Sequence, residues 1–159
     1  NLFSYTSIFS LFALEGKAKN VVNLDMVAGV LKTAQRNHSL NNLGDGKASF
    51  YKRDIMKSAS QYSRQGPYDL IIIDPPPYQK KSFRGWSDYQ KLLRRCASCL
   101  NPQGSILASL NNPHITLEEF QQQLREVFPH AQNLEVIKTS REIKERDSEK
   151  GLKLVNIAL

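Results

Sequence analysis

Short runs of apolar and β-branched residues alternate along the chain with longer stretches of helical periodicity. The apolar runs predict seven strands, at residues 2–5, 20–25, 48–52, 68–73, 104–110, 134–138 and 152–159. The stretches between them predict helices at residues 8–14, 27–37, 55–64, 88–100 and 116–127. Alternation of strands and helices indicates a parallel sheet, and the last two strands follow each other directly. The pattern therefore predicts an α/β fold of the Rossmann-like, doubly wound kind, with a mostly parallel seven-stranded sheet and an antiparallel edge strand.

Length and composition predict a single domain over residues 1–159. The chain is 40% hydrophobic and 23% charged, and its two cysteines are too few for a disulfide framework. The longest apolar run, Leu70 to Ile73, is far shorter than the ~20 residues of a membrane helix, so we expect a cytoplasmic protein without membrane contact. The first residue is Asn1 rather than Met, which is compatible with a fragment of a longer protein.

Positive charge is concentrated in one part of the chain. The net charge is +7, and the segment from Gln79 to Arg95 holds six basic residues and one acid. The basic residues near the C-terminus are instead mixed with acids, which is typical of a solvated surface. The segment 79–95 is therefore the predicted anion-binding face.

Polar and acidic residues follow the first four predicted strands, where ligands bind in doubly wound sheets. The first strand runs into a polar turn made of Ser4, Tyr5, Thr6 and Ser7. Asp25, Asp54 and Asp74 end the next three strands, and three prolines and Tyr78 follow Asp74. Asp25 and Asp54 could each be no more than the cap of the next helix, and the prolines could be a stiff surface turn. Three carboxylates at successive strand ends nevertheless favour a ligand site.

The order LFSYT, VVNLDM, RDI and YDLIIIDPP, with an aromatic residue two positions after the second proline, resembles the class I S-adenosylmethionine-dependent methyltransferases. Among these, the chain is most similar to the large-subunit ribosomal RNA methyltransferases of the K/L and I types, over nearly its whole length. The resemblance implies S-adenosylmethionine as cofactor and ribosomal RNA as partner. It implies that the polar turn holds the methionine moiety, and that the residues after the second and third strands hold the adenosine. Carried over by position, the cofactor-binding residues are Ser4, Tyr5, Thr6, Ser7, Asp25, Met26, Asp54, Ile55 and Asp74, and the catalytic residues beside the methyl group and target base are Asp74, Pro75, Pro76 and Tyr78.

Two departures from the family pattern affect the predicted function. The family's turn usually reads YTGGF, whereas this chain has Ser7 and Ile8 in place of the two glycines, which predicts weaker cofactor binding. Members that methylate carbon 5 of cytosine place a nucleophilic cysteine after strand five, where this chain has Ser109 and Leu110. We therefore expect methylation of a base nitrogen, as a step of ribosomal RNA processing. A non-catalytic RNA-binding module with a degenerate cofactor turn, and a methyltransferase for a protein or small molecule, remain alternatives.

Aromatic and basic residues after the prolines predict an RNA-contacting loop. Tyr78 could stack on an unpaired base, and the loop residues predicted to bind RNA are Lys80, Lys81, Phe83, Arg84 and Trp86. The alternative is a solvated basic flap that closes over the cofactor.

The remaining candidate metal or redox residues indicate no such site. Cys96 and Cys99 are interpreted as structural thiols, and the three histidines are too scattered to bind a metal.

Overall fold

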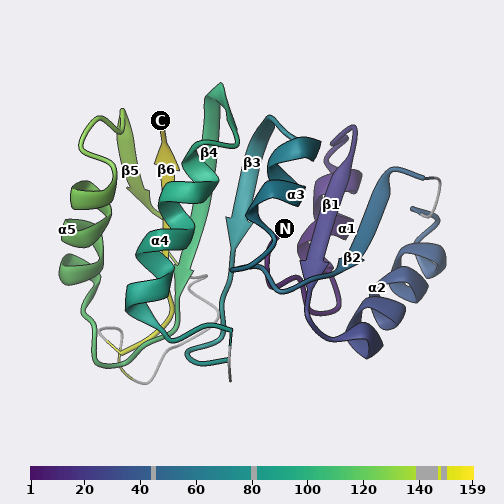
Figure 1. Ribbon diagram of the computed structural model, residues 1–159, viewed down its shortest axis with the longest axis horizontal. Coiled ribbons are helices and arrows are strands. Elements are labelled where there is room, and N and C mark those ends of the chain that lie inside the picture. Colours follow the sequence, from purple (N-terminus) through teal and green to yellow (C-terminus); the bar gives the residue numbers. More distant parts are fainter. Residues whose placement is uncertain (44–45, 80–81, 139–146, 148–149) are drawn as a thin grey trace. The chain divides into compact units, whose positions relative to one another are not determined.

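The structure is a computed structural model that describes residues 1–43, 46–79, 82–138, 147 and 150–159 (Figure 1). The chain separates into two compact units, residues 1–58 and 59–159. Across the described residues, six strands are present, two in the first unit and four in the second. No described helix has the length and apolar character needed to cross a membrane.

The first unit contains a parallel pair of strands, β1 (Val21–Asp25) and β2 (Ala48–Lys52), with helices α1 (Ile8–Glu15) and α2 (Ala28–Leu40). The strand predicted at residues 2–5 is reduced to one parallel bridge, from Leu2 to Leu24. Phe3 and Tyr5 have φ angles of 55° and 47°, in the left-handed region, and so cannot continue an extended strand.

A chain of buried hydrogen bonds fixes the interior of the first unit. His38 Nδ1 lies 2.8 Å from the Ala34 carbonyl oxygen, which can only accept, so this nitrogen carries the proton. In the neutral ring Nε2 then accepts from the Ser10 hydroxyl at 2.9 Å, and Ser10 Oγ accepts from the Asn23 amide at 3.0 Å. The three side chains are almost fully buried, and these bonds give His38 a packing role.

The second unit is a four-stranded sheet in the order β3-β4-β6-β5. β3 (Tyr68–Ile73) runs parallel to β4 (Leu100–Leu110), with Ile73 opposite Ala108. β6 (Lys153–Ala158) is antiparallel to both β4 and β5 (Asn133–Val136), so the last strand lies between two earlier ones. The last two strands are antiparallel to each other, as predicted, but the predicted antiparallel edge strand is wrong. Because β6 inserts between β4 and β5, the antiparallel strand lies inside the sheet, and the edge strand β5 runs parallel to β4.

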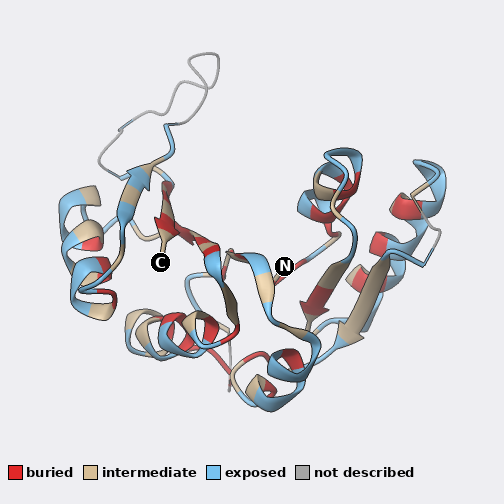
Figure 2. Ribbon diagram, turned by 90° about the horizontal axis from the view of Figure 1, so that it is seen from above, coloured by how far each residue is buried: buried red, intermediate tan, exposed pale blue. Residues whose placement is uncertain are grey.

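Three helices complete the second unit: α3 (Ala59–Gln65), α4 (Trp86–Ala97) and α5 (Leu117–Val127). α4 packs on β4 and α5 on β6, and their buried residues form stripes on one side of each helix (Figure 2). On α4 the buried residues are Tyr89, Leu92, Leu93 and Cys96, a spacing that places them on a single face. α5 starts with the expected capping box, in which Thr116 and Glu119 each bond the other's backbone N–H.

Several boundaries differ from the predicted ones because local caps override the hydrophobic pattern. α4 starts two residues before Asp88, whose carboxylate accepts the Arg84 backbone N–H at 2.9 Å. α3 starts four residues later than predicted, because Asp54 caps a separate turn through the Met56 N–H. β4 begins at Leu100 and continues through Pro102, which the prediction placed in a loop.

Candidate active site

In the first unit, the polar turn and Asp25 are brought together. The Ser7 N–H donates to the Ser4 carbonyl oxygen at 2.7 Å, which closes the turn. The Asp25 carboxylate accepts the Tyr5 N–H through Oδ2 and the Val27 N–H through Oδ1, each at 2.9 Å. Asp25 therefore ties the turn to the segment that leads into α2, and it is more than a cap of the next helix.

Two buried hydroxyl groups in this turn lack partners. Ser4 and Ser7 are 5% and 0% exposed, and neither Oγ atom has a hydrogen-bond partner among the described residues. A buried polar group without a partner costs about 1–3 kcal/mol. Hydroxyls that donate and accept match the carboxylate and ammonium of an amino acid, so the turn fits the methionine end of the cofactor.

Of the two residues that replace the family's glycines, Ser7 has the unusual backbone and Ile8 does not. Ser7 has φ 60° and ψ 38°, in the left-handed region, and is the N-cap of α1. Ile8 is the first residue of that helix and is not among the residues with positive φ. The family pattern suggested backbone strain at the β-branched Ile8. The strain is at Ser7 instead.

Asp54 and its neighbours have a simpler local explanation. Asp54 Oδ1 accepts the Met56 N–H at 3.1 Å, and Oδ2 lies 3.6 Å from Lys57 Nζ. Ile55 is buried and Met26 is half-buried. These contacts match the capping alternative for Asp54, so the adenine contacts of Asp54, Ile55 and Met26 stay predictions.

In the second unit, Asp74 follows β3 directly and bonds to the end of β4. Asp74 Oδ1 accepts a hydrogen bond from the Ser109 hydroxyl. Tyr89, fully buried on α4, donates its hydroxyl to the Ser109 carbonyl oxygen at 2.8 Å. Burial raises the pKa of the Tyr89 hydroxyl well above its ordinary value, so it remains a donor at neutral pH.

The prolines after Asp74 form one wall of a shallow pocket, here called the strand-tip pocket. Aromatic side chains and the residues that follow β4 form the rest of it, and Tyr78 next to it is 64% exposed. The lining residues are Pro75, Pro76, Pro77, Phe83, Gly85, Trp86, Tyr89, Leu110, Asn111 and Asn112.

One residue of the predicted RNA-contacting loop, Phe83, is buried rather than exposed. Phe83 is only 2% exposed, and its ring packs edge-on against Tyr89 at 6.3 Å, so it cannot stack on RNA as expected. Trp86 is half-buried and packs on Tyr89 and Phe120. Arg84 is exposed, and Lys80 and Lys81 lie outside the described residues.

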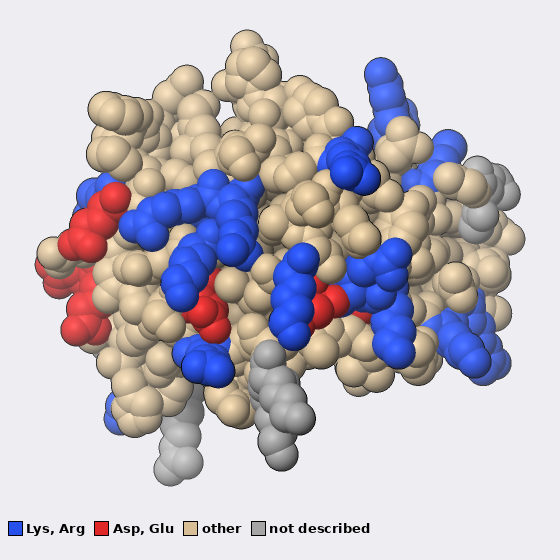
Figure 3. Space-filling model, viewed as in Figure 1, with Lys and Arg blue, Asp and Glu red and all other residues tan. Residues whose placement is uncertain are grey.

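Basic side chains gather over α4 on the face shown in Figure 3. Lys91, Arg94 and Arg95 are exposed on this helix, and Lys91 lies 3.5 Å from the Asp88 carboxylate. With Arg84, they keep the predicted anion-binding character of the segment.

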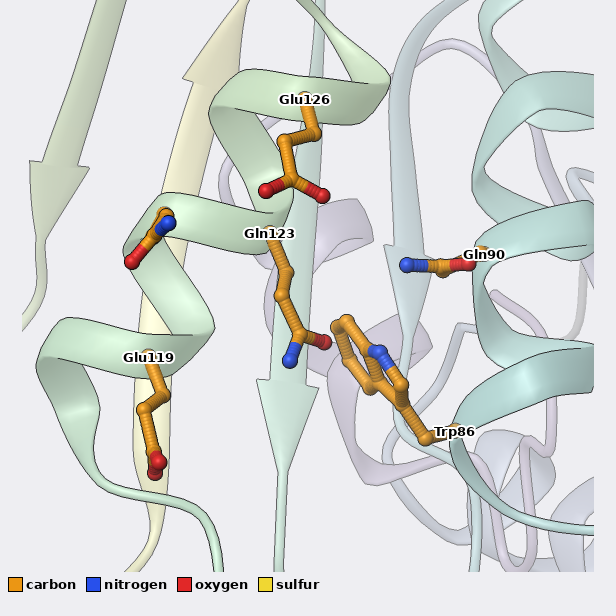
Figure 4. A pocket seen from close by; sticks show the side chains of 6 residues that line it. Trp86, Gln90, Glu119, Gln123 and Glu126 are labelled. Carbon is orange, nitrogen blue, oxygen red and sulfur yellow. The ribbon is translucent and has the colours of Figure 1, made fainter.

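A second pocket, of about 230 Å³, lies between α4 and α5 (Figure 4). Its lining contains two carboxylates and no Lys or Arg: Trp86, Gln90, Glu119, Gln122, Gln123 and Glu126. Backbone and side-chain bonds from Thr116 lower the pKa of Glu119, which stays ionised at neutral pH. Its negative charge does not suit a phosphate-bearing ligand.

The sequence prediction missed two residues that hold the end of β4, Ser109 in β4 itself and Lys153 in β6. Ser109 was considered only for the cysteine it replaces, yet it bonds Asp74. Lys153, 3% exposed, donates to the Asn112 carbonyl oxygen at 2.9 Å and so holds the segment after β4. The one signal in the sequence was the presence of Lys153 in the otherwise apolar last strand.

The cysteines lie in the packed interior. Cys96 and Cys99 are both free and buried. Burial, followed by the neighbouring Cys99, raises the pKa of the Cys96 thiol far above its usual range. This favours the interpretation as structural thiols.

The model of the S-adenosylmethionine-dependent methyltransferase family matches residues 1–157. The chain therefore belongs to that family, whose defining cofactor is S-adenosylmethionine. The resemblance seen in the sequence is confirmed at this level.

Curated relatives and a solved structure add detail. The chain is 35% identical over 128 residues to ribosomal RNA large subunit methyltransferase I of Tolumonas auensis, covering 76% of this chain and 32% of that protein. It is 38% identical over 124 residues to ribosomal RNA large subunit methyltransferase K/L of Alteromonas mediterranea, covering 75% and 17%. The chain thus spans about a third or less of these relatives. The crystal structure of SMU.776 complexed with SAH matches all of this chain and 44% of its own, with a TM-score of 0.85 and 28% identity. The α/β methyltransferase fold is thereby confirmed, whereas the seventh strand is not.

Proposed function

We propose that this protein transfers a methyl group from S-adenosylmethionine to a nitrogen of a base in ribosomal RNA. The observation that carries the proposal is the end of β3, where the Asp74 carboxylate leads into three prolines and the exposed ring of Tyr78. An acceptor of hydrogen bonds beside a flat aromatic surface suits an unstacked base. The names of the curated relatives support ribosomal RNA as the substrate.

The first unit is proposed to hold the cofactor. Ser4 and Ser7 would bond its amino-acid end through their unpartnered hydroxyls, and Asp25 would accept from the ribose. Met26, Asp54 and Ile55 would contact the adenine. S-adenosylmethionine supplies an electrophilic methyl group when bound. The chain's own task is to align the donor with the acceptor, and such alignment can lower the activation free energy by several kcal/mol, up to ~7–11 in the best cases.

The second unit is proposed to hold the base. Asp74 would accept a hydrogen bond from an amino or ring N–H, and Tyr78 would stack on the base for about 1–3 kcal/mol. Ser109 stands where carbon-5 enzymes need a thiol, so attack by a base nitrogen without a covalent intermediate is the simpler chemistry. Phosphates would meet Arg84 and the cations of α4.

Two finer predictions belong to the same proposal. One is that residues 1–159 act as a single domain with a doubly wound sheet. The other is a cytoplasmic location, where ribosomal RNA is available.

The test is a single-turnover transfer of labelled methyl to deproteinised large-subunit ribosomal RNA, with cofactor binding measured separately by calorimetry. Asp74→Ala should lower the transfer rate about 100-fold or more and change cofactor affinity only a few-fold, because its contact to the base matters in the transition state. Asp69→Ala on the same strand is the matched control, since Asp69 bonds the exposed Asn101 amide at 2.6 Å. Full activity of correctly folded Asp74→Ala would refute the assignment.

A second candidate function rests on Ser7, whose strained backbone replaces a glycine of the family pattern. Under this candidate the chain binds RNA but has lost the cofactor. RNA binding with no heat of cofactor binding at millimolar concentration would favour it over catalysis.

A further inference from the structure

Ser109 is fixed in place from two sides. Its neighbour Ala108 lies opposite Ile73 in the parallel β3–β4 pair, so Ser109 falls next to Asp74, the residue after Ile73. The side chain is 4% exposed, and its hydroxyl donates to Asp74 Oδ1. Its carbonyl oxygen accepts from the buried Tyr89 hydroxyl at 2.8 Å. The donor is therefore held by the sheet on one side and by α4 on the other.

The bond makes the two oxygens of Asp74 different. Oδ1 is engaged by Ser109, whereas Oδ2 accepts no hydrogen bond from any residue that the structure describes. An exposed carboxylate rotates freely about its last bond, so either oxygen could face a ligand. A buried hydroxyl that holds Oδ1 fixes the plane of the carboxylate and leaves Oδ2 as the available acceptor.

We propose that Ser109 is a positioning residue for methyl transfer, which orients Asp74 so that Oδ2 meets an N–H of the target base. This inference rests on the proposed function of Asp74. Alignment is the main contribution of a methyltransferase to its reaction, so loss of one orienting bond should slow transfer more than it weakens binding.

The experiment compares the unaltered protein, Ser109→Ala, Asp74→Ala and the double variant in single-turnover methyl transfer. Binding of an RNA oligonucleotide is measured in parallel through the fluorescence of Trp86, the one tryptophan of the chain, which lines the strand-tip pocket. Ser109→Ala should slow transfer about tenfold or more with RNA affinity changed less than about twofold, and it should cost nothing further in the Asp74→Ala background. Ser105→Ala, in the middle of β4 and away from Asp74, is the control that should leave the rate unchanged.

A second variant guards against a folding defect in the first. Tyr89→Phe keeps the aromatic ring but releases the Ser109 carbonyl oxygen, and it should slow transfer in the same direction by a smaller factor. A full transfer rate in folded Ser109→Ala, or losses that multiply in the double variant, would overturn the inference.

A structural measurement keeps this test separate from that of the proposed function. In a crystal structure of Ser109→Ala, the Asp74 carboxylate should lose its single orientation. A carboxylate that keeps one orientation would overturn the inference whether or not the protein methylates RNA. Failure of the unaltered protein to methylate RNA at all would instead refute the proposed function.

Discussion

Replacing Ser7 by glycine should stabilise the protein without cofactor, although it removes a side chain. Ser7 has φ 60°, which costs a residue other than glycine about 1–2 kcal/mol. Its hydroxyl is fully buried and has no hydrogen-bond partner in the described part of the chain, so removing it should raise the free energy of unfolding by about 1–3 kcal/mol. Against this, glycine lowers the free energy of unfolding by roughly 0.5–1 kcal/mol, because it gives the unfolded chain more conformational freedom. The net gain in the free energy of unfolding should be about 1–4 kcal/mol.

Urea unfolding measures this gain in the free energy of unfolding. The same measurement with cofactor present tests whether the Ser7 hydroxyl contacts the cofactor. If the Ser7 hydroxyl bonds the cofactor, Ser7→Gly should weaken cofactor binding about tenfold, equivalent to about 1.4 kcal/mol. Saturating cofactor should then narrow the stability gap between the variant and the unaltered protein. Ser39→Gly, in the ordinary backbone of helix α2, is the control and should lose stability. A destabilised Ser7→Gly without cofactor would refute the reasoning about strain and the unpartnered hydroxyl.

Three further predictions concern the second unit. Tyr78→Ala should raise the RNA concentration for half-maximal transfer about tenfold, as expected for the loss of ~1–3 kcal/mol of stacking, while Tyr78→Phe should be nearly silent; equal losses in both would point to the hydroxyl instead. If about three cations of segment 79–95 contact phosphates, the log of the binding constant for single-stranded RNA plotted against log salt concentration should have a slope near −2. Replacing Arg94 and Arg95 by Glu should flatten this slope, and an unchanged slope would place the RNA elsewhere. Burial raises the pKa of the Cys96 thiol, so the folded state holds this proton more tightly than the unfolded state. The free energy of unfolding should therefore be unaffected by ionisation of this thiol below pH ~8.5 and should decrease as the pH rises above it. Urea unfolding between pH 7 and 10 should show this decrease, and rapid alkylation of the native thiol at pH 8 would contradict it.

The sequence predicted the elements with strong hydrophobic patterns. Tyr68–Ile73 is a strand with the predicted bounds, and Thr116 and Glu119 form the predicted capping box. Where the prediction failed, backbone conformation was the cause. Phe3 and Tyr5 have the composition of a strand but left-handed φ angles, and no glycine marks the change.

The site residues divide in a similar way. Asp25 and Asp74 could be found because an acid at the end of an apolar run is conspicuous, and their roles stay predictions. Ser109 could not be found, because its importance comes from a pairing register between β3 and β4 that no local pattern contains. Phe83 was placed at the surface because it lies among cations, whereas its ring is buried against Tyr89.

The position of β6 has a consequence for how the protein is made. β6 ends at Ala158 but completes the sheet between β4, which ends at Leu110, and β5. At ~5–20 residues per second, a ribosome needs roughly 2–10 s to add the 158 − 110 = 48 residues that separate these ends. During that time the edge of β4 that β6 will cover has no partner strand, and unpaired edges recruit other chains. The strands of the first unit, by contrast, are complete at Lys52, so their pairing does not wait for the C-terminal residues.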